Sequence, residues 1–134
     1  MIHERSKFLA KNWSDLKKVK ILNFIDFNTF ENVEIRVGEI KKAELYPEAK
    51  KPAIKLLINF GSTIGEKKSS AQITNHYKPT ELIGKKVLAV INLKPRQIGN
   101  FISEVLVLGV PDIKEEGVIL VVPEHETKIG SRLY

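Results

Sequence analysis

Apolar and polar residues alternate through most of the chain after residue 28, which is the pattern of half-buried β-strands. In the stretch VEIRVGEIKKAELY (33–46), Val33, Ile35 and Val37 alternate with polar residues. Five more segments have the length of strands, the third of them shorter and more polar than the rest: 53–61, 85–93, 68–73, 103–110 and 117–123. Glycine or proline stands at most of the joins, as expected for tight connections.

One segment predicts a short helix. In KPTELIG (78–84), Pro79 and Glu81 come just before an apolar pair, and Gly84 ends the turn. Five or six short strands with one small helix between the third and fourth describe a small closed barrel, and the OB-fold is the commonest such plan. We therefore predict an all-β domain, a five-stranded OB-fold barrel, over residues 27–134.

Residues 1–26 have a different pattern. Leu9, Trp13, Leu16 and Val19 lie on one stripe of a helix, and lysines occupy its other faces. This predicts an amphipathic N-terminal helix as an extension to the barrel. Two interpretations stay open: the stripe packs on the barrel or on a second subunit, which we favour, or the basic helix lies on a membrane, a partner or nucleic acid.

The charge distribution adds a candidate ligand class. The net charge is +6, but residues 36–96 carry thirteen bases and five acids, whereas residues 112–134 carry three bases and five acids. A basic middle region attracts polyanions through counterion release. The alternative is that these lysines serve only to keep the surface soluble.

Several function classes are disfavoured. The chain has no cysteine, so disulfides and thiol chemistry are excluded. His3, His76 and His125 have no neighbouring ligands at metal-binding spacing, and no phosphate-binding glycine loop or nucleophile elbow occurs. We expect no metal, no cofactor and no enzymatic activity. With no secretory signal and no 18-residue apolar run, a cytoplasmic protein is expected.

Polar side chains interrupt the apolar strands at three places that neighbouring barrel strands could bring to one mouth: Ser70 and Gln72; Asn92, Lys94 and Arg96; Ser103 and Glu104. Lysine and arginine suit phosphate, whereas hydroxyl and amide groups suit sugar hydroxyls and base edges. Alternatively, Ser103, Glu104 and Gln72 form a structural clamp with the loop backbone. A carboxylate repels phosphate, so Glu104 is better placed to order Arg96 or Lys94, or to accept a hydrogen bond from an amino or hydroxyl group.

The connection NLKPRQIGNFISEVLVLG (92–109) is too long for a plain hairpin, which needs two to five turn residues. Its two cations and its proline and glycine are expected to form the rim of the barrel mouth. Ser103 and Glu104 are expected to close the floor of the pocket.

Four stretches together resemble the tRNA-binding-domain family: FENVEIRVGEIKKAELYPEAKKPAIKLLINFG, SSAQIT, INLKPRQIGNFISEVLVLG and TKIGSRLY. This OB-fold family occurs as the C-terminal module of many bacterial methionyl-tRNA synthetases and in related synthetase-associated cofactors. PEAKKPAIKL with KKSSAQIT is most similar to its free-standing branch, the CsaA secretion chaperones. The resemblance covers about residues 30–130 and leaves out residues 1–26.

The resemblance implies a homodimer, affinity for tRNA or other RNA and, in the CsaA branch, binding of unfolded preproteins together with the export machinery. It places a ligand pocket on each subunit at the same seven residues: Ser70, Gln72, Asn92, Lys94, Arg96, Ser103 and Glu104. Two functions stay open. We favour a CsaA-like export chaperone that binds unfolded preproteins and has RNA-binding capacity. The alternative is a dedicated, structure-specific tRNA-binding protein that assists aminoacylation or tRNA handling.

Overall fold

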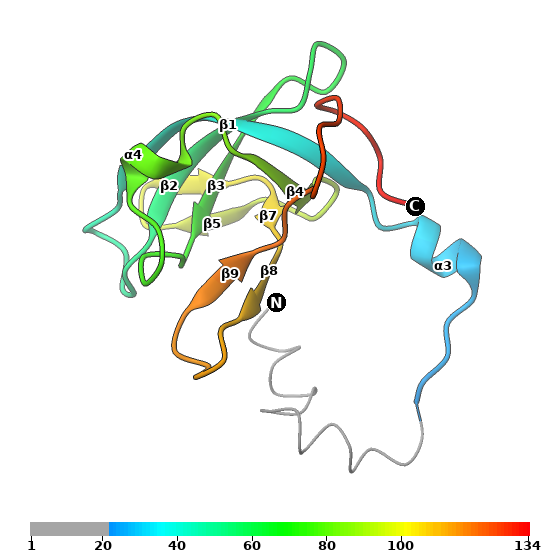
Figure 1. Ribbon diagram of the computed structural model, residues 1–134, viewed down its shortest axis with the longest axis horizontal. Coiled ribbons are helices and arrows are strands. Elements are labelled where there is room, and N and C mark those ends of the chain that lie inside the picture. The colour runs from blue at the N-terminus through cyan, green and yellow to red at the C-terminus, as the bar shows by residue number, and fades with distance from the viewer. Residues whose placement is uncertain (1–21) are drawn as a thin grey trace. The chain divides into compact units, whose positions relative to one another are not determined.

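The computed structural model describes residues 22–134, of which residues 31–134 form one compact unit (Figure 1). The expected N-terminal helix and its apolar stripe lie outside the described residues, apart from residues 22–26, which are not helical. A short helix, α3 (Phe27–Glu31), leads into the barrel. The expected domain boundary between residues 26 and 27 stays a prediction. Within residues 22–134, no helix is long and apolar enough to cross a membrane.

The predicted barrel is confirmed. Five antiparallel strands form one sheet in the order β3-β2-β1-β4-β7. Their bounds are β1 (Ile35–Leu45), β2 (Ile54–Asn59), β3 (Glu66–Ala71), β4 (Lys86–Val90) and β7 (Leu106–Val107). The helix α4 (Pro79–Leu82) lies between β3 and β4, as the sequence predicts.

The core follows from the alternation of apolar residues. In β2, Ile54, Leu56 and Ile58 are buried while the residues between them are not. Phe60, just after β2, is also buried and lies so close to β1 that position 38 must be glycine: a Cβ on Gly38 would lie 2.5 Å from Ile58 Cγ2 and 2.7 Å from Phe60 Cε1. The sequence therefore has a glycine between Val37 and Glu39, because any side chain there would prevent this close packing.

The prediction of one strand over residues 103–110 is wrong. The chain there forms three short strands with different partners: β6 (Phe101–Ser103) with β5 (Arg96–Ile98), β7 with β4, and β8 (Gly109–Pro111) with β9 (Val118–Leu120). Figure 1 shows β8 and β9 as a separate hairpin beside the barrel. A continuous apolar run records that a segment is buried, but not how often it changes partner.

The β8–β9 hairpin is fixed to the turn before α4. His76 Nε2 lies 2.7 Å from Asp112 Oδ2, and the Glu116 amide donates to the other Asp112 oxygen. The hydrogen bond from His76, followed by that from Glu116, holds the pKa of the Asp112 carboxyl below its ordinary value. The Leu120 amide donates to the Tyr77 hydroxyl. His76 thus pairs with a carboxylate in the hairpin loop.

Candidate functional site

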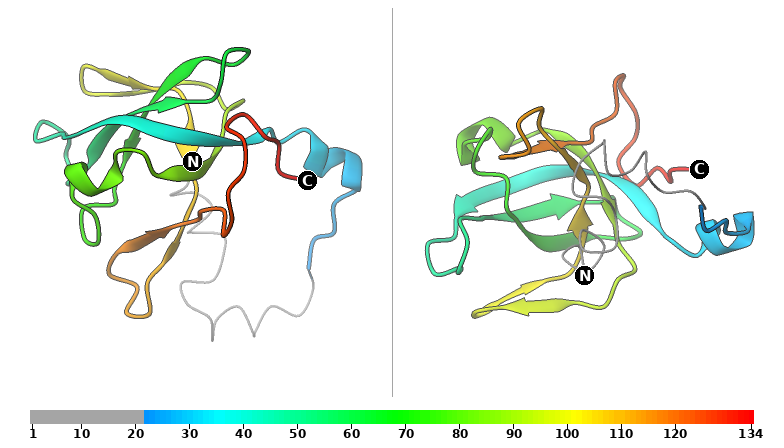
Figure 2. Two further views of the ribbon diagram at one scale, coloured as in Figure 1. Left: turned by 45° about the horizontal axis from the view of Figure 1, so that its top comes forward. Right: turned by 90° about the horizontal axis from the view of Figure 1, so that it is seen from below.

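The long connection between β4 and β7 contains a hairpin of its own. β5 and β6 pair antiparallel and are joined by Gly99 and Asn100 alone. Gly99 has a φ of +62°, the positive value that the first position of a type II′ turn requires. We call residues 94–103 the basic hairpin. Figure 2 shows it, in yellow, beside the green strands of the barrel.

Two aromatic rings and two lysines hold the basic hairpin against the sheet. The Tyr46 hydroxyl donates to the Ile98 carbonyl oxygen, and the rings of Tyr46 and Phe101 lie with their centroids 5.8 Å apart. Lys55 Nζ lies 5.1 Å from the Tyr46 ring centroid, and Lys68 Nζ lies 5.3 Å from that of Phe101. These cation–π contacts place two positive charges beside the aromatic pair that holds the hairpin to the sheet.

Ser103 and Glu104 bind the backbone of β3. The Lys68 amide donates to Glu104 Oε1 at 3.0 Å, and the Ser70 amide donates to Ser103 Oγ at 3.0 Å. In return, the Glu104 amide donates to the Lys68 carbonyl oxygen at 2.8 Å. The two side chains therefore take the place of the carbonyl groups of a neighbouring strand, and they accept hydrogen bonds from the backbone amides at this edge of β3.

A buried hydroxyl completes this junction. Ser69 is 1% exposed, and its Oγ donates to the Val105 carbonyl oxygen at 3.0 Å. The junction closes the barrel between β3 and the segment that enters β7. We call it the clasp, and its members are Lys68, Ser69, Ser70, Ser103, Glu104 and Val105.

Asn92 also binds backbone, but at another place. Its Oδ1 accepts from the Glu34 amide at 2.9 Å, and its Nδ2 donates to the Asn32 carbonyl oxygen at 2.7 Å. The side chain thus holds the start of β1 beside the end of β4. Among the seven predicted site residues, Asn92, Ser103 and Glu104 therefore use their polar atoms within the fold.

The remaining members of the predicted site are more open. Lys94, Arg96 and Gln72 are exposed, and Arg96 lies opposite Ser103 in the β5–β6 pair, next to the clasp. The structure thus brings Ser70, Arg96, Ser103 and Glu104 together. Contact between these residues and a ligand stays a prediction.

Three lysines on the outer face of the sheet were not among the predicted residues. Lys42 and Lys68 lie on either side of Leu57 in neighbouring strands, and Lys55 lies opposite Ser70. The alternation in AIKLLINFG could have identified Lys55, because it separates Lys55 from the buried Ile54 and Leu56. Together with Lys94 and Arg96 of the basic hairpin, these three lysines form a set that we call the basic face: Lys42, Lys55, Lys68, Lys94 and Arg96.

The basic face is short of neutralising partners. Lys55 pairs with Glu44 at 3.0 Å. Within residues 22–134, no ion pair involves Lys42, Lys68, Lys94 or Arg96. In the described part of the chain, four cations of the basic face therefore have no carboxylate partner.

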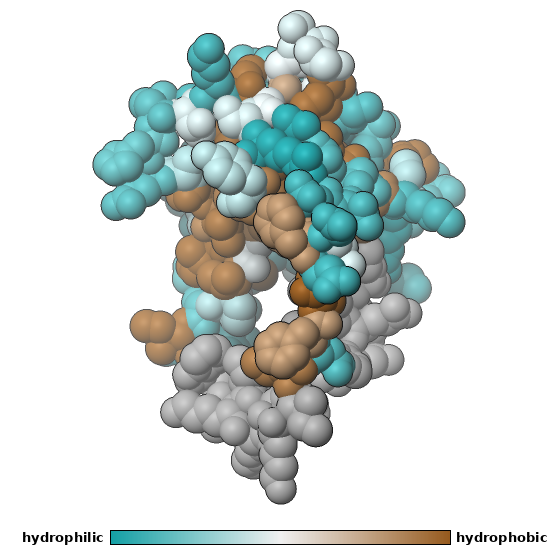
Figure 3. Space-filling model, turned by 90° about the vertical axis from the view of Figure 1, so that its right-hand side faces the viewer, coloured by the Kyte–Doolittle hydropathy of each residue, from teal (hydrophilic) through white to brown (hydrophobic). Residues whose placement is uncertain are grey.

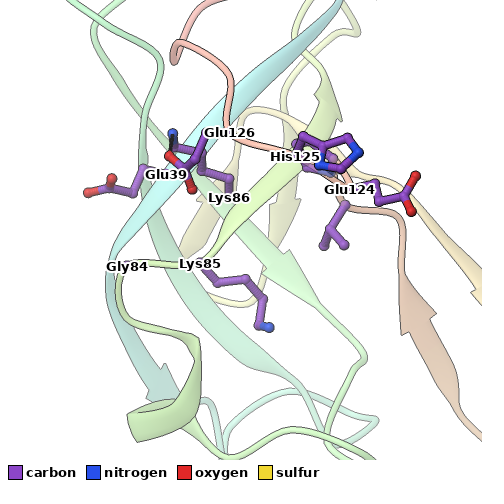
Figure 4. Close-up of a pocket in the computed structure, with 9 residues that line it drawn as sticks. Glu39, Gly84, Lys85, Lys86, Glu124, His125 and Glu126 are labelled. Carbon is purple, nitrogen blue, oxygen red and sulfur yellow. Dashed lines mark hydrogen bonds and ion pairs between the residues drawn. The ribbon is translucent and has the colours of Figure 1, made fainter.

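A separate depression of about 620 Å³ lies between the start of β4 and residues 122–126 (Figure 4). Lys86 Nζ lies 3.0 Å from Glu126, and the lining includes the further carboxylates of Glu39 and Glu124. Because its carboxylates outnumber its lysines, this depression is poorly suited to phosphate. No group of three or more His, Asp or Glu side chains in the described part of the chain could hold a metal ion.

A small barrel with a cationic outer face is typical of proteins that bind oligonucleotides on a strand face and its adjoining loops. The family model "Putative tRNA binding domain" matches residues 35–132. The chain therefore belongs to the tRNA-binding-domain family, which confirms the resemblance found in the sequence.

The solved structures to which the chain is similar include two CsaA chaperones. The chain is 51% identical to the CsaA chaperone protein of Picrophilus torridus, with a TM-score of 0.77 over 83% of this chain and all of that chain. For the chaperone CsaA of Bacillus anthracis the identity is 40% and the TM-score 0.77, over 84% of this chain and all of that chain.

Curated relatives include longer enzymes. The chain is 33% identical over 133 residues to the methionine–tRNA ligase of Methanocaldococcus jannaschii, which is 98% of this chain but 20% of the ligase. Against the ligase of Methanococcus aeolicus the share is 84% of this chain and 16% of the ligase, at 36% identity. The chain thus spans a fifth or less of the length of these ligases.

The clasp predicts a structural effect of Glu104. Glu104→Ala should lower the free energy of unfolding by about 1–2 kcal/mol, because the Lys68 amide loses its acceptor. Glu104→Gln keeps an acceptor oxygen and should retain most of the stability. Urea unfolding measures both, with Glu124→Ala in an exposed loop as the control. A Glu104→Ala protein as stable as the wild type would show that the clasp does not hold the barrel closed.

Proposed function

We propose that this protein is a non-catalytic binding protein that grips tRNA, or RNA of similar fold, by its phosphate backbone on the basic face. The observation that carries the proposal is the exposed pair Lys94 and Arg96 on the basic hairpin, held in place by the clasp and without carboxylate partners in residues 22–134. Membership of the tRNA-binding-domain family supports the same ligand.

The form of the surface favours backbone recognition over the reading of single-stranded bases. Proteins that bind single strands present open aromatic rings on which bases stack. Here Tyr46 is only 5% exposed, and Lys55 and Lys68 lie over the rings of Tyr46 and Phe101. Cations with little aromatic surface suit the phosphates of a folded RNA, which is recognised largely by shape.

This proposal predicts steep salt dependence. Two phosphate contacts alone should weaken tRNA binding about tenfold between 50 and 200 mM salt. The double variant Lys94→Ala/Arg96→Ala should lose most of the affinity, because its hairpin no longer offers those two contacts. Filter binding with total tRNA at both salt concentrations measures each effect.

A matched control comes from two exposed lysines outside the basic face. Lys78→Ala/Lys114→Ala removes the same charge and should bind tRNA nearly as well as the wild type. Equal losses in the two double variants would mean that net charge alone matters. A salt-independent affinity would contradict phosphate contact.

A second candidate function is export chaperone for unfolded preproteins, working with the export machinery in the cytoplasm. The observation that favours it is the 51% identity to a CsaA chaperone protein that the chain covers in full. The surface is compatible with it, since Ile102 is 37% exposed on the basic hairpin. Figure 3 shows further apolar side chains at the surface among hydrophilic ones. Mixed apolar and basic surface suits an extended polypeptide.

The chaperone candidate predicts that the purified protein suppresses aggregation of a chemically unfolded client at a near-equimolar ratio. Light scattering during dilution of the client from denaturant follows this directly. Total tRNA added as a competitor should restore aggregation if both ligands use the basic face. A folded protein that leaves client aggregation unchanged would count against this candidate.

We further propose a homodimer, because β4 is apolar on both sides. Val87 and Ala89 belong to the core and Val90 is also buried, whereas Leu88, on the other side of the strand from Val87 and Ala89, is only half-buried. Strands that are apolar on both faces are typically covered on both faces. Within residues 31–134, Val122 is another apolar side chain left 45% exposed.

Static light scattering should therefore give about twice the 15.2 kDa chain mass at micromolar concentration. Leu88→Lys should shift the mass toward that of one chain, whereas Lys67→Ala, in the same sheet, should not. A wild-type mass of one chain would contradict the homodimer.

A further inference from the structure

Two arginines lie directly opposite each other at the end of the barrel away from the Tyr46 loop. Arg36 in β1 and Arg132 in the C-terminal segment form an isolated antiparallel bridge, so their side chains share one face. Both reach Glu34: Arg36 Nε donates to Oε1 at 2.8 Å, and Arg132 Nη2 lies 3.5 Å from Oε2. One carboxylate between two guanidinium groups leaves one positive charge over.

Arg36 is held in a fixed orientation. Its Nε and Nη2 donate to Glu34, and its Nη1 donates to the Gly130 carbonyl oxygen at 2.9 Å. The side chain is 28% exposed. A guanidinium group has five N–H donors, so these three bonds leave two for another acceptor. An arginine oriented in advance loses less freedom when it binds an oxyanion.

Arg36 lines a depression of about 410 Å³ together with the loop between β2 and β3, and we call this depression the Arg36 pocket. Its other lining residues are Phe60, Gly61, Ser62, Thr63, Ile64, Ile129 and Gly130. Pockets of this size hold small ligands or parts of larger ones. Glu66, the carboxylate that follows the loop, is not among the lining residues.

The loop offers further donors to the Arg36 pocket. Gly61 and Gly65 have φ values of +94° and +85°, and the Gly65 amide donates to the Gly61 carbonyl oxygen at 2.7 Å, which closes the loop. Ser62 and Thr63 are exposed at its tip. Within residues 22–134, neither of their backbone amides donates to a protein acceptor. Hydroxyls, amides and a guanidinium group thus border one hollow.

We propose that the Arg36 pocket binds a phosphodiester group of a bound RNA, as a contact separate from the basic hairpin. This inference rests on the RNA-binding function proposed above. The residual positive charge and the two unused N–H donors of Arg36 suit an oxyanion. RNA is the favoured source because it carries phosphates at regular spacing and can therefore occupy the Arg36 pocket and the basic face together, which strengthens binding beyond either contact.

The test places a negative charge in the pocket. Ser62→Glu and Thr63→Glu should each weaken binding of fluorescently labelled tRNA about tenfold and lower the salt slope by about one. Thr80→Glu, at an exposed position on α4, adds the same charge elsewhere and should stay within about twofold of the wild type. Fluorescence anisotropy at two salt concentrations measures all three.

A second measurement separates this inference from the proposed function. Inorganic phosphate is titrated into 15N-labelled protein, and the Ser62 and Thr63 amides and Arg36 Nε should shift in a saturable way that Thr63→Glu abolishes. Wild-type RNA binding with no effect of either loop variant overturns the Arg36 pocket but not RNA binding. Phosphate shifts in a protein that binds no RNA mean an adventitious ion only, and overturn both. Weakened RNA binding confined to the loop variants, with saturable phosphate shifts, supports the inference.

Discussion

Closure of the barrel between β3 and residues 103–105 is the constraint on which the rest of the structure depends. The sheet order leaves β3 at one edge, and the clasp satisfies that edge with the side chains of Ser103 and Glu104 and with the buried Ser69 hydroxyl. The same bonds fix where β6 ends, and hence where the basic hairpin ends. A junction needed for stability therefore also sets the position of the cations that the proposed ligand would meet.

Polar residues beside a proposed ligand site can thus act entirely within the fold. Asn92, Ser103 and Glu104 each bind backbone groups, and this leaves the ligand to Lys94, Arg96 and the lysines of the outer sheet face. The charge of such a surface attracts RNA, and the neighbouring apolar groups suit an unfolded polypeptide. The tRNA-binding-domain family supports RNA as the proposed ligand, and the similarity to a CsaA chaperone supports the chaperone candidate.

The sequence predicted those features that depend on local pattern. Strand alternation identified β1 and β2, and the Pro79–Gly84 turn identified α4, because burial and turn chemistry are encoded within a few residues. The role of Glu104 stayed open between a clamp and a ligand contact, since its partner Lys68 lies 36 residues away. For the same reason the partners of Asn92, 58 and 60 residues away, were out of reach. The single strand expected at 103–110 failed because burial alone does not identify a strand's partner.

The proposed RNA-binding surface is the basic hairpin, which the clasp holds in place. Hydrogen–deuterium exchange of the full chain with and without saturating tRNA tests it most directly, because it reports every backbone amide without a substitution. Exchange across residues 94–103 should slow on tRNA binding, whereas exchange in the β8–β9 loop at residues 112–117 should stay unchanged. Protection confined to other segments, with residues 94–103 exchanging as fast as in the free protein, would contradict it.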